Sequence, residues 1–173
     1  MTRIIRPSRT RSTWALYAKS WLNAALFFAV FMIAAPWASH RLAPSPLPVP
    51  FWLRSVGVVL AIAGGGVWIA CLDVFSRRGR GTPFPLDAPS RLVTGGPFAV
   101  IRNPIMAAEL AVVWGEALYF SGAGLVGYAA VVTLAAHAIV VHVEEPELHQ
   151  RFGEQFAAYC RGVPRWLPRR ARP

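Results

Sequence analysis

The chain has 173 residues, of which 55% are hydrophobic and only 15% charged, and it carries a formal net charge of +10. So small a charged fraction excludes a disordered chain and a soluble basic nucleic-acid-binding protein. A mean hydropathy of +0.42 with charge confined to the segment edges is typical of a small integral membrane protein of one domain.

Four apolar stretches predict an all-α fold, a four-helix transmembrane bundle, over residues 14–38, 51–75, 104–121 and 123–143. A membrane-spanning helix needs about 20 apolar residues, which all but the third stretch supply. The third is shorter and contains Glu109 and Glu116. The first could also be a secretory signal peptide. It is long and rich in aromatics, however, and Pro36-Trp37 follows where small residues would be expected.

Two features of the apolar region are predicted to have structural roles. The proline-rich connection over residues 42–50 is predicted to be a stiff, extended spacer without chemistry. Gly64, Gly65 and Gly66, in the second stretch, would allow either a close helix approach or a local kink.

Basic residues predict the orientation in the membrane. They concentrate in the tail 1–13, in the inner loop 76–103 extending to the foot of the third stretch, and in the segment 144–173. With four spans, 16 of the 18 Lys and Arg residues fall on one side, and only Arg41 and Arg54 do not. The positive-inside rule then places both termini in the cytoplasm. With three or five spans the basic segments would lie on opposite sides of the membrane. Their common location therefore indicates that the third apolar stretch also spans the membrane.

The inner loop contains a candidate anion site. Its end, residues 94–104, combines a Gly-rich turn with Arg102 and with Pro104, which can open a helix. Backbone N–H groups at a helix N-terminus suit an anion, and an arginine suits a carboxylate or phosphate. The arginines between residues 77 and 80 could instead anchor anionic lipid headgroups.

The C-terminal segment begins at Glu144 and Glu145, directly after the fourth stretch. We expect them at a helix C-terminus, where the helix dipole disfavours negative charge, which indicates a positive partner: an arginine of the inner loop or a cationic ligand. Apolar side chains from Leu148 to Tyr159 recur at three- and four-residue spacings and predict one amphipathic cytoplasmic helix. It would either lie on the membrane or cover the inner loop.

Ionisable residues inside the spans are candidates for function. Glu109, Glu116 and His137 lie at membrane depth, where such groups are rare and usually functional. Glu109 and His137 could pair. A structural hydrogen bond and a place in a substrate pocket are equally open for them. Cys71 and Cys160 are predicted to be free thiols, and they and the four histidines lack the spacing of a metal site, so no metal is expected.

Two motifs together resemble a known family. The first is Gly96-Pro97-Phe98-Ala-Val-Ile-Arg102-Asn103-Pro104, and the second starts at Glu144-Glu145 and continues through Leu148, Phe152 and Tyr159 to Val163-Pro164. In this order they resemble the isoprenylcysteine carboxyl methyltransferase family, the wider group that includes phospholipid methyltransferases. The resemblance covers roughly residues 50–168. Asn103, where eukaryotic members have His, is found in bacterial members.

The resemblance implies an S-adenosylmethionine-dependent integral membrane methyltransferase of the bacterial inner membrane, acting on a lipophilic or amphipathic acceptor. Arg102, as a catalytic residue, would take the cofactor carboxylate, and Glu145 or Glu144 would accept from its ribose hydroxyls or amino group. The implied cofactor-binding residues are Gly96, Pro97, Phe98, Arg102, Asn103, Pro104, Glu144 and Glu145. The predicted catalytic residues are Arg102 and Glu145, and the predicted substrate-pocket residues are Met106, Glu109 and His137.

Met106 departs from the family, which usually has Tyr two residues after the proline. Displacement at a methyl group mostly needs in-line positioning, so neither a nucleophilic residue nor a metal is required. Expected partners are membrane lipids and the acceptor, with no nucleic acid. The alternatives are an NADPH-dependent sterol-type membrane reductase and a non-catalytic membrane scaffold with a vestigial pocket.

Overall fold

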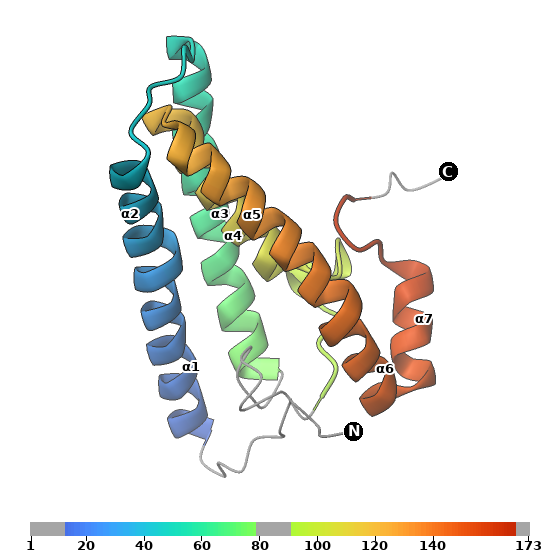
Figure 1. Cartoon of the computed structure of the whole chain (residues 1–173). Coiled ribbons are helices and arrows are strands. Elements are labelled where there is room, and N and C mark those ends of the chain that lie inside the picture. The colour runs from blue at the N-terminus through green and yellow to red at the C-terminus, as the bar shows by residue number, and fades with distance from the viewer. Residues whose placement is uncertain (1–12, 79–90, 169–173) are drawn as a thin grey trace. The chain divides into compact units, whose positions relative to one another are not determined.

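The computed structural model describes residues 13–78 and 91–168, which are predominantly helical (Figure 1). In these ranges three helices are long and apolar enough to cross a membrane, Trp21–Leu42, Phe51–Phe75 and Ala123–Phe152. The predicted all-α membrane class is therefore confirmed. The third predicted span forms α4 (Pro104–Phe120), whose 17 residues are fewer than in those three helices. Almost all of the basic tail 1–13, the loop residues 79–90 and the last arginines at 169–172 lie outside the described residues.

The first and last long helices each contain a π-helical segment. The first runs through α1 (Thr13–Phe27), a π segment (Phe28–Ala34) and α2 (Ala35–Leu42). The last runs through α5 (Ala123–Ile139), a π segment (Val140–Glu144) and α6 (Glu145–Phe152). In both, a proline follows two residues after the π segment, Pro36 and Pro146. Proline lacks an N–H and clashes with the carbonyl four residues back, so a locally widened turn lets each helix continue.

Contacts divide the chain into two compact units, which are described separately. The motif unit comprises Met1–Ala24, Ile69–Pro104 and Val141–Pro173, and the bundle unit comprises Ala25–Trp68 and Ile105–Val140. Helix α3 (Phe51–Arg78) contributes residues to both.

The bundle unit has an apolar core with a few polar links between its helices. Helix α2 packs beside α5. The Tyr128 hydroxyl donates to the Phe31 carbonyl at 2.6 Å, and the Trp114 indole N–H donates to the Thr133 hydroxyl at 3.0 Å. Such bonds satisfy polar groups that lipid could not. The core consists of Met32, Val112, Val113, Ala117, Leu125 and Ala129.

Glycines bring α3 and α4 into backbone contact within the bundle unit. A Cβ on Gly57 would lie 2.6 Å from the Gly115 carbonyl oxygen, and one on Gly115 would lie 2.6 Å from that of Gly57. About two turns further along α3, a Cβ on Gly64 would lie 2.8 Å from the Ala108 carbonyl oxygen. The predicted close approach at Gly64 is therefore confirmed, while Gly65 and Gly66 have nothing within 4 Å of an added Cβ.

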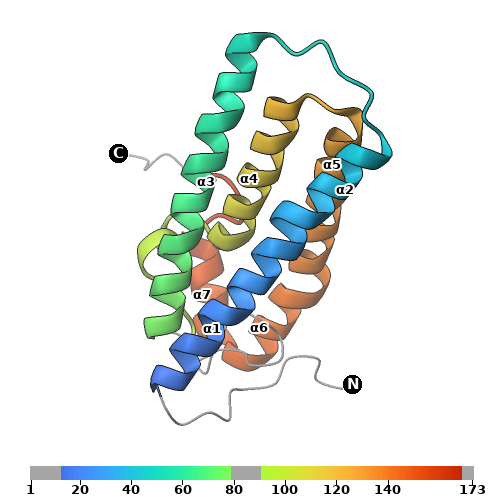
Figure 2. The ribbon, with the colours of Figure 1, turned by 90° about the vertical axis from the view of Figure 1, so that its left-hand side faces the viewer.

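The proline-rich connection is paired along its length with the turn between α4 and α5. Backbone N–H groups of Leu47, Ala123 and Gly124 donate to carbonyls across this contact, at 2.7, 2.9 and 3.1 Å. Pro46 and Gly122 form an antiparallel bridge. The expectation of a simple spacer was thus incomplete, because the connection closes this end of the bundle unit (Figure 2).

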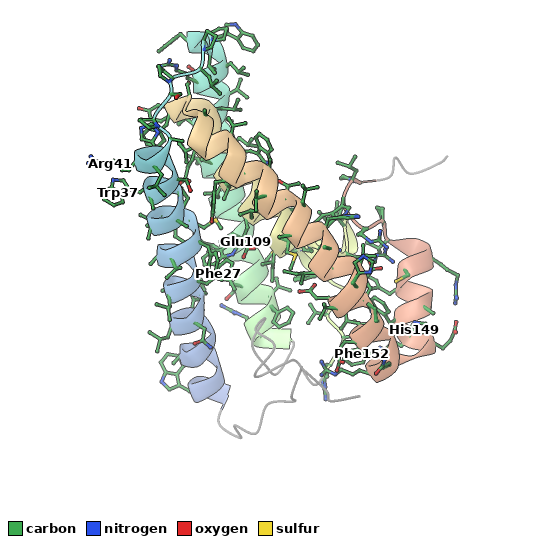
Figure 3. All side chains as sticks on the ribbon, in the orientation of Figure 1. Phe27, Trp37, Arg41, Glu109, His149 and Phe152 are labelled. Atoms are coloured by element: carbon green, nitrogen blue, oxygen red, sulfur yellow. The ribbon has the colours of Figure 1, made fainter. Side chains whose placement is uncertain are left out.

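The C-terminal segment differs from the single helix predicted for it. It forms α6 and then α7 (Glu154–Gly162), which pack against each other. Gly153 separates them with φ 52° and ψ −126°, a conformation that glycine adopts without steric cost. On α6, which carries His149 and Phe152 (Figure 3), the Arg151 guanidinium lies 5.2 Å from the centroid of the Phe152 ring. The His149 ring packs against Phe156 of α7.

Glu144 and Glu145 do not mark a helix end, and the argument from the helix dipole was wrong. The helix continues from Ala123 to Phe152, so both carboxylates lie inside it. The need of Glu145 for a positive partner has another origin, which is the burial of its side chain, 18% exposed.

Candidate functional site

The first motif forms a turn, a short helix and the start of α4. Gly96 has φ +66°, and an added Cβ would lie 3.3 Å from the Val74 side chain, so glycine is the residue this backbone favours. A 3₁₀ helix follows over Gly96–Ala99. Helix α4 then begins at Pro104, as predicted.

Phe98 connects this turn to its surroundings in two ways. Its ring is only 6% exposed and packs against Phe75, with centroids 6.0 Å apart. Its backbone carbonyl accepts a hydrogen bond from the Tyr159 hydroxyl at 2.5 Å. Phe98, one of the implied cofactor-binding residues, is therefore a packed ring, and α7 is tied to the first motif through the backbone.

Tyr159 provides a test of this tie. Burial raises the pKa of Tyr159 to about 12, so the folded state favours the protonated hydroxyl that donates to Phe98. A raised pKa gives stability that is present below the ordinary value near 10 and is lost as the pH rises towards 12. We expect Tyr159→Phe to lower stability by about 1 kcal/mol at neutral pH and to remove this alkaline loss. Thermal unfolding at pH 8 and pH 11 measures both, and an unchanged alkaline loss in the variant would contradict the assignment.

The chain after α7 docks on the end of the first motif through backbone hydrogen bonds. The Arg102 N–H donates to the Pro164 carbonyl at 2.8 Å. The backbone N–H and the side-chain Nδ2 of Asn103 both donate to the Arg165 carbonyl, each at 3.4 Å. Pro164 and Arg165 thus cover the two residues that precede α4.

Glu145 is held by two arginines. Arg165 donates Nε to Oε1 and Nη2 to Oε2, both at 2.7 Å, as a bidentate fork. Arg102 places Nη2 3.1 Å from Oε1. The side chains of Arg102 and Glu145 are 12% and 18% exposed, so the pair is well shielded from water. Of the two positive partners considered for this carboxylate, the arginine of the inner loop is present as Arg102.

Arg165 was not found by the sequence reasoning. It directly follows Val163-Pro164, where the second motif ends, and the adjacent position was its only signal. Its hydrogen bonds to Glu145 raise the pKa of Arg165 above its ordinary value, so it stays charged.

Two polar groups at this cluster lack a protein partner in the described part of the chain. Nε of Arg102 is buried and has no acceptor. Glu144, a neighbour of Glu145 that is partly buried, accepts no hydrogen bond from residues 13–78 or 91–168. A buried N–H without an acceptor is costly and calls for a ligand or water. A buried donor without an acceptor and a carboxylate without a donor are a suitable pair for a zwitterionic ligand.

The predicted substrate-pocket residues lie in the bundle unit, separate from the cofactor residues, all of which lie in the motif unit. The Glu109 carboxylate accepts from the Trp68 indole N–H at 3.0 Å (Figure 3), and Phe28 packs against Trp68. Met106 is half-buried and His137 is exposed. Pairing of Glu109 with His137 stays a prediction. Glu116, one of the intramembrane candidates, has a buried Oε2 without a partner among the described residues.

The two cysteines and the possible metal ligands were also located in the structure. Cys71 is buried, Cys160 is partly exposed, and both are free thiols, as predicted. Within residues 13–78 and 91–168, no group of three or more His, Cys, Asp and Glu side chains could hold a metal ion.

Comparison with known proteins gives the family. The sequence model of one family, described as phospholipid methyltransferase, matches residues 52–155, more than half of the chain. The chain belongs to the phospholipid methyltransferase family. The match includes the first motif and Glu144-Glu145 and ends before Arg165. A search of curated proteins finds no match. Membership in the phospholipid methyltransferase family, with three helices able to span a membrane, implies an integral membrane methyltransferase.

Proposed function

We propose that this protein is an S-adenosylmethionine-dependent methyltransferase that transfers a methyl group to a lipophilic or amphipathic acceptor. The observation that carries the proposal is Arg102, whose buried Nε has no acceptor while its Nη2 is fixed by Glu145. A guanidinium held in this way is prepared for an anionic group, and the cofactor has one carboxylate.

The residues present fit the rest of the cofactor. Glu144 is free to accept from an amino group or ribose hydroxyls, and the turn at Gly96 keeps the backbone open at a position where a side chain would be strained. Phe98 holds that backbone by its buried ring and Asn103 by its contact to the Arg165 carbonyl, while Pro97 and Pro104 have a fixed φ. The bound cofactor would supply an activated methyl group on its sulfonium. The protein would bind it, orient it and exclude water.

The acceptor is proposed to be lipophilic because its predicted pocket residues lie in apolar helices. Met106, Glu109 and His137 belong to α4 and α5. A carboxylate at this depth, held by Trp68, suits a polar head on an otherwise apolar molecule.

We propose four spans, with α4 as the third and both termini in the cytoplasm of a bacterial inner membrane. The support is the distribution of basic residues, which falls almost entirely on one side in this arrangement alone. At 1.5 Å per residue α4 is about 25 Å long, which is short for a bilayer core of about 30 Å but not prohibitive with local thinning.

Calorimetric titration of the purified protein with S-adenosylhomocysteine tests the proposal. We expect saturable binding with one site per chain. Absence of binding by a folded sample would contradict the proposed function. Protection against thermal unfolding by NADPH, but not by S-adenosylhomocysteine, would point instead to the reductase alternative. Detection of labelled methyl groups in membranes with and without the protein would then identify the acceptor.

A further inference from the structure

Arg165 and Arg102 compete for the same carboxylate. Oε1 of Glu145 accepts from Nε of Arg165 at 2.7 Å and lies 3.1 Å from Nη2 of Arg102, while Oε2 accepts from Nη2 of Arg165 at 2.7 Å. Arg165 therefore has the fork, and Arg102 has a single contact. The side chain of Arg165 is 33% exposed against 12% for Arg102, so the fork is formed by the outer of the two arginines.

This division explains why Nε of Arg102 is without an acceptor. Carboxylates prefer a bidentate arrangement with arginine, and each fork uses two N–H groups of the guanidinium. Without Arg165, Glu145 could form a bidentate pair with Arg102. Its carboxylate would then accept from Nε of Arg102, which now has no acceptor, as well as from Nη2. An anionic ligand would then have to displace Glu145.

We propose that Arg165 is a positioning residue that keeps Glu145 from forming a bidentate fork with Arg102, so that Nε of Arg102 stays available for the carboxylate of the ligand. The inference rests on the proposed function, and it assigns Glu145 to holding the site instead of contacting the ligand. Glu144, which has no such partner, is the carboxylate left for the ligand.

The backbone around Arg165 also contacts the segment that contains Arg102. Its carbonyl accepts from Asn103, and the preceding Pro164 carbonyl accepts from the Arg102 N–H. The residue that holds Glu145 is thus fixed to the two residues that precede α4. Its guanidinium has little freedom to release Glu145 while this docking persists.

Binding of two ligands to a set of variants tests the role of Arg165. S-adenosylhomocysteine has the amino-acid carboxylate, and 5′-methylthioadenosine lacks it. We expect Arg165→Ala to weaken binding of S-adenosylhomocysteine about tenfold, as for one charge-assisted hydrogen bond, and to leave binding of 5′-methylthioadenosine unchanged. Adding Glu145→Gln to Arg165→Ala should then restore most of the lost affinity, because the neutral amide no longer captures Arg102.

The restoration separates positioning from a merely structural role. A structural contact would make the double variant at least as weak as Arg165→Ala, and this result would overturn the inference. So would equal losses for both ligands, because they would report a damaged site. Arg161→Ala is the matched control, since Arg161 pairs with Glu154 at 2.6 Å on the exposed side of α7, and it should bind as the unsubstituted protein does.

Two further outcomes are decided by the same titrations. Arg165→Lys keeps the charge but not the fork, so we expect it to weaken binding of S-adenosylhomocysteine; unchanged binding would show that the fork is not needed and would contradict the competition between the arginines. Absence of S-adenosylhomocysteine binding by the unsubstituted protein would overturn the proposed function, and this inference with it.

Discussion

Arg102→Gln is expected to weaken binding of S-adenosylhomocysteine by roughly 10- to 100-fold, which corresponds to the 1.5–3 kcal/mol typical of hydrogen bonds to charged groups. The substitution removes a buried Nε that has no acceptor among the residues that the structure describes. Glu145 would keep its fork to Arg165, so its charge would stay neutralised and the cluster would stay folded. Calorimetric titration of the two proteins measures the change.

The second ligand shows whether the loss belongs to the carboxylate. Binding of 5′-methylthioadenosine should be the same in Arg102→Gln and in the unsubstituted protein, because this ligand has no group for Arg102. Arg161→Gln, which changes an exposed arginine of α7, should affect neither ligand. If Arg102→Gln weakened both ligands equally, Arg102 would be supporting the fold, and its assignment to the carboxylate would be wrong.

The long helices could be predicted because a membrane requires long apolar runs. Three of the four stretches became helices able to span one, and the fourth became the shorter α4. The ends of these helices were harder to predict from the sequence. The helix from Ala123 was expected to stop at residue 143, where charged residues begin, but it continues to Phe152. The π turn before Pro146 permits this, and nothing in the local hydropathy indicates it.

The site was only partly predictable for a related reason. Gly96, Arg102 and Glu145 belong to motifs that are read locally, and the structure brings Arg102 and Glu145 into contact. Arg165 was missed because its contact to Glu145 spans 20 residues and depends on the turn at Gly153. The paired outer connection was missed similarly, since backbone hydrogen bonds leave no pattern in side-chain types.

Gly115→Ala is expected to lower stability by about 2–3 kcal/mol, the upper part of the range for overpacking. The added Cβ would lie 2.6 Å from the Gly57 carbonyl oxygen and 2.8 Å from the Ala61 nitrogen. Both are backbone atoms, which cannot turn aside as a flexible side chain can, so α3 and α4 would have to separate. For a chain of this size the loss corresponds to a decrease in Tm of roughly 5 °C or more, measured by thermal unfolding in detergent.

Gly66→Ala is the matched control, because it makes the same chemical change in α3 where an added Cβ meets nothing within 4 Å. Alanine forms helices better than glycine by up to about 1 kcal/mol, so this variant should be as stable as the original or slightly more so. The two substitutions should therefore move Tm in opposite directions or by clearly different amounts. Equal stability of the two variants would mean that the backbones of α3 and α4 do not touch at Gly57 and Gly115, since helix propensity alone would then account for both.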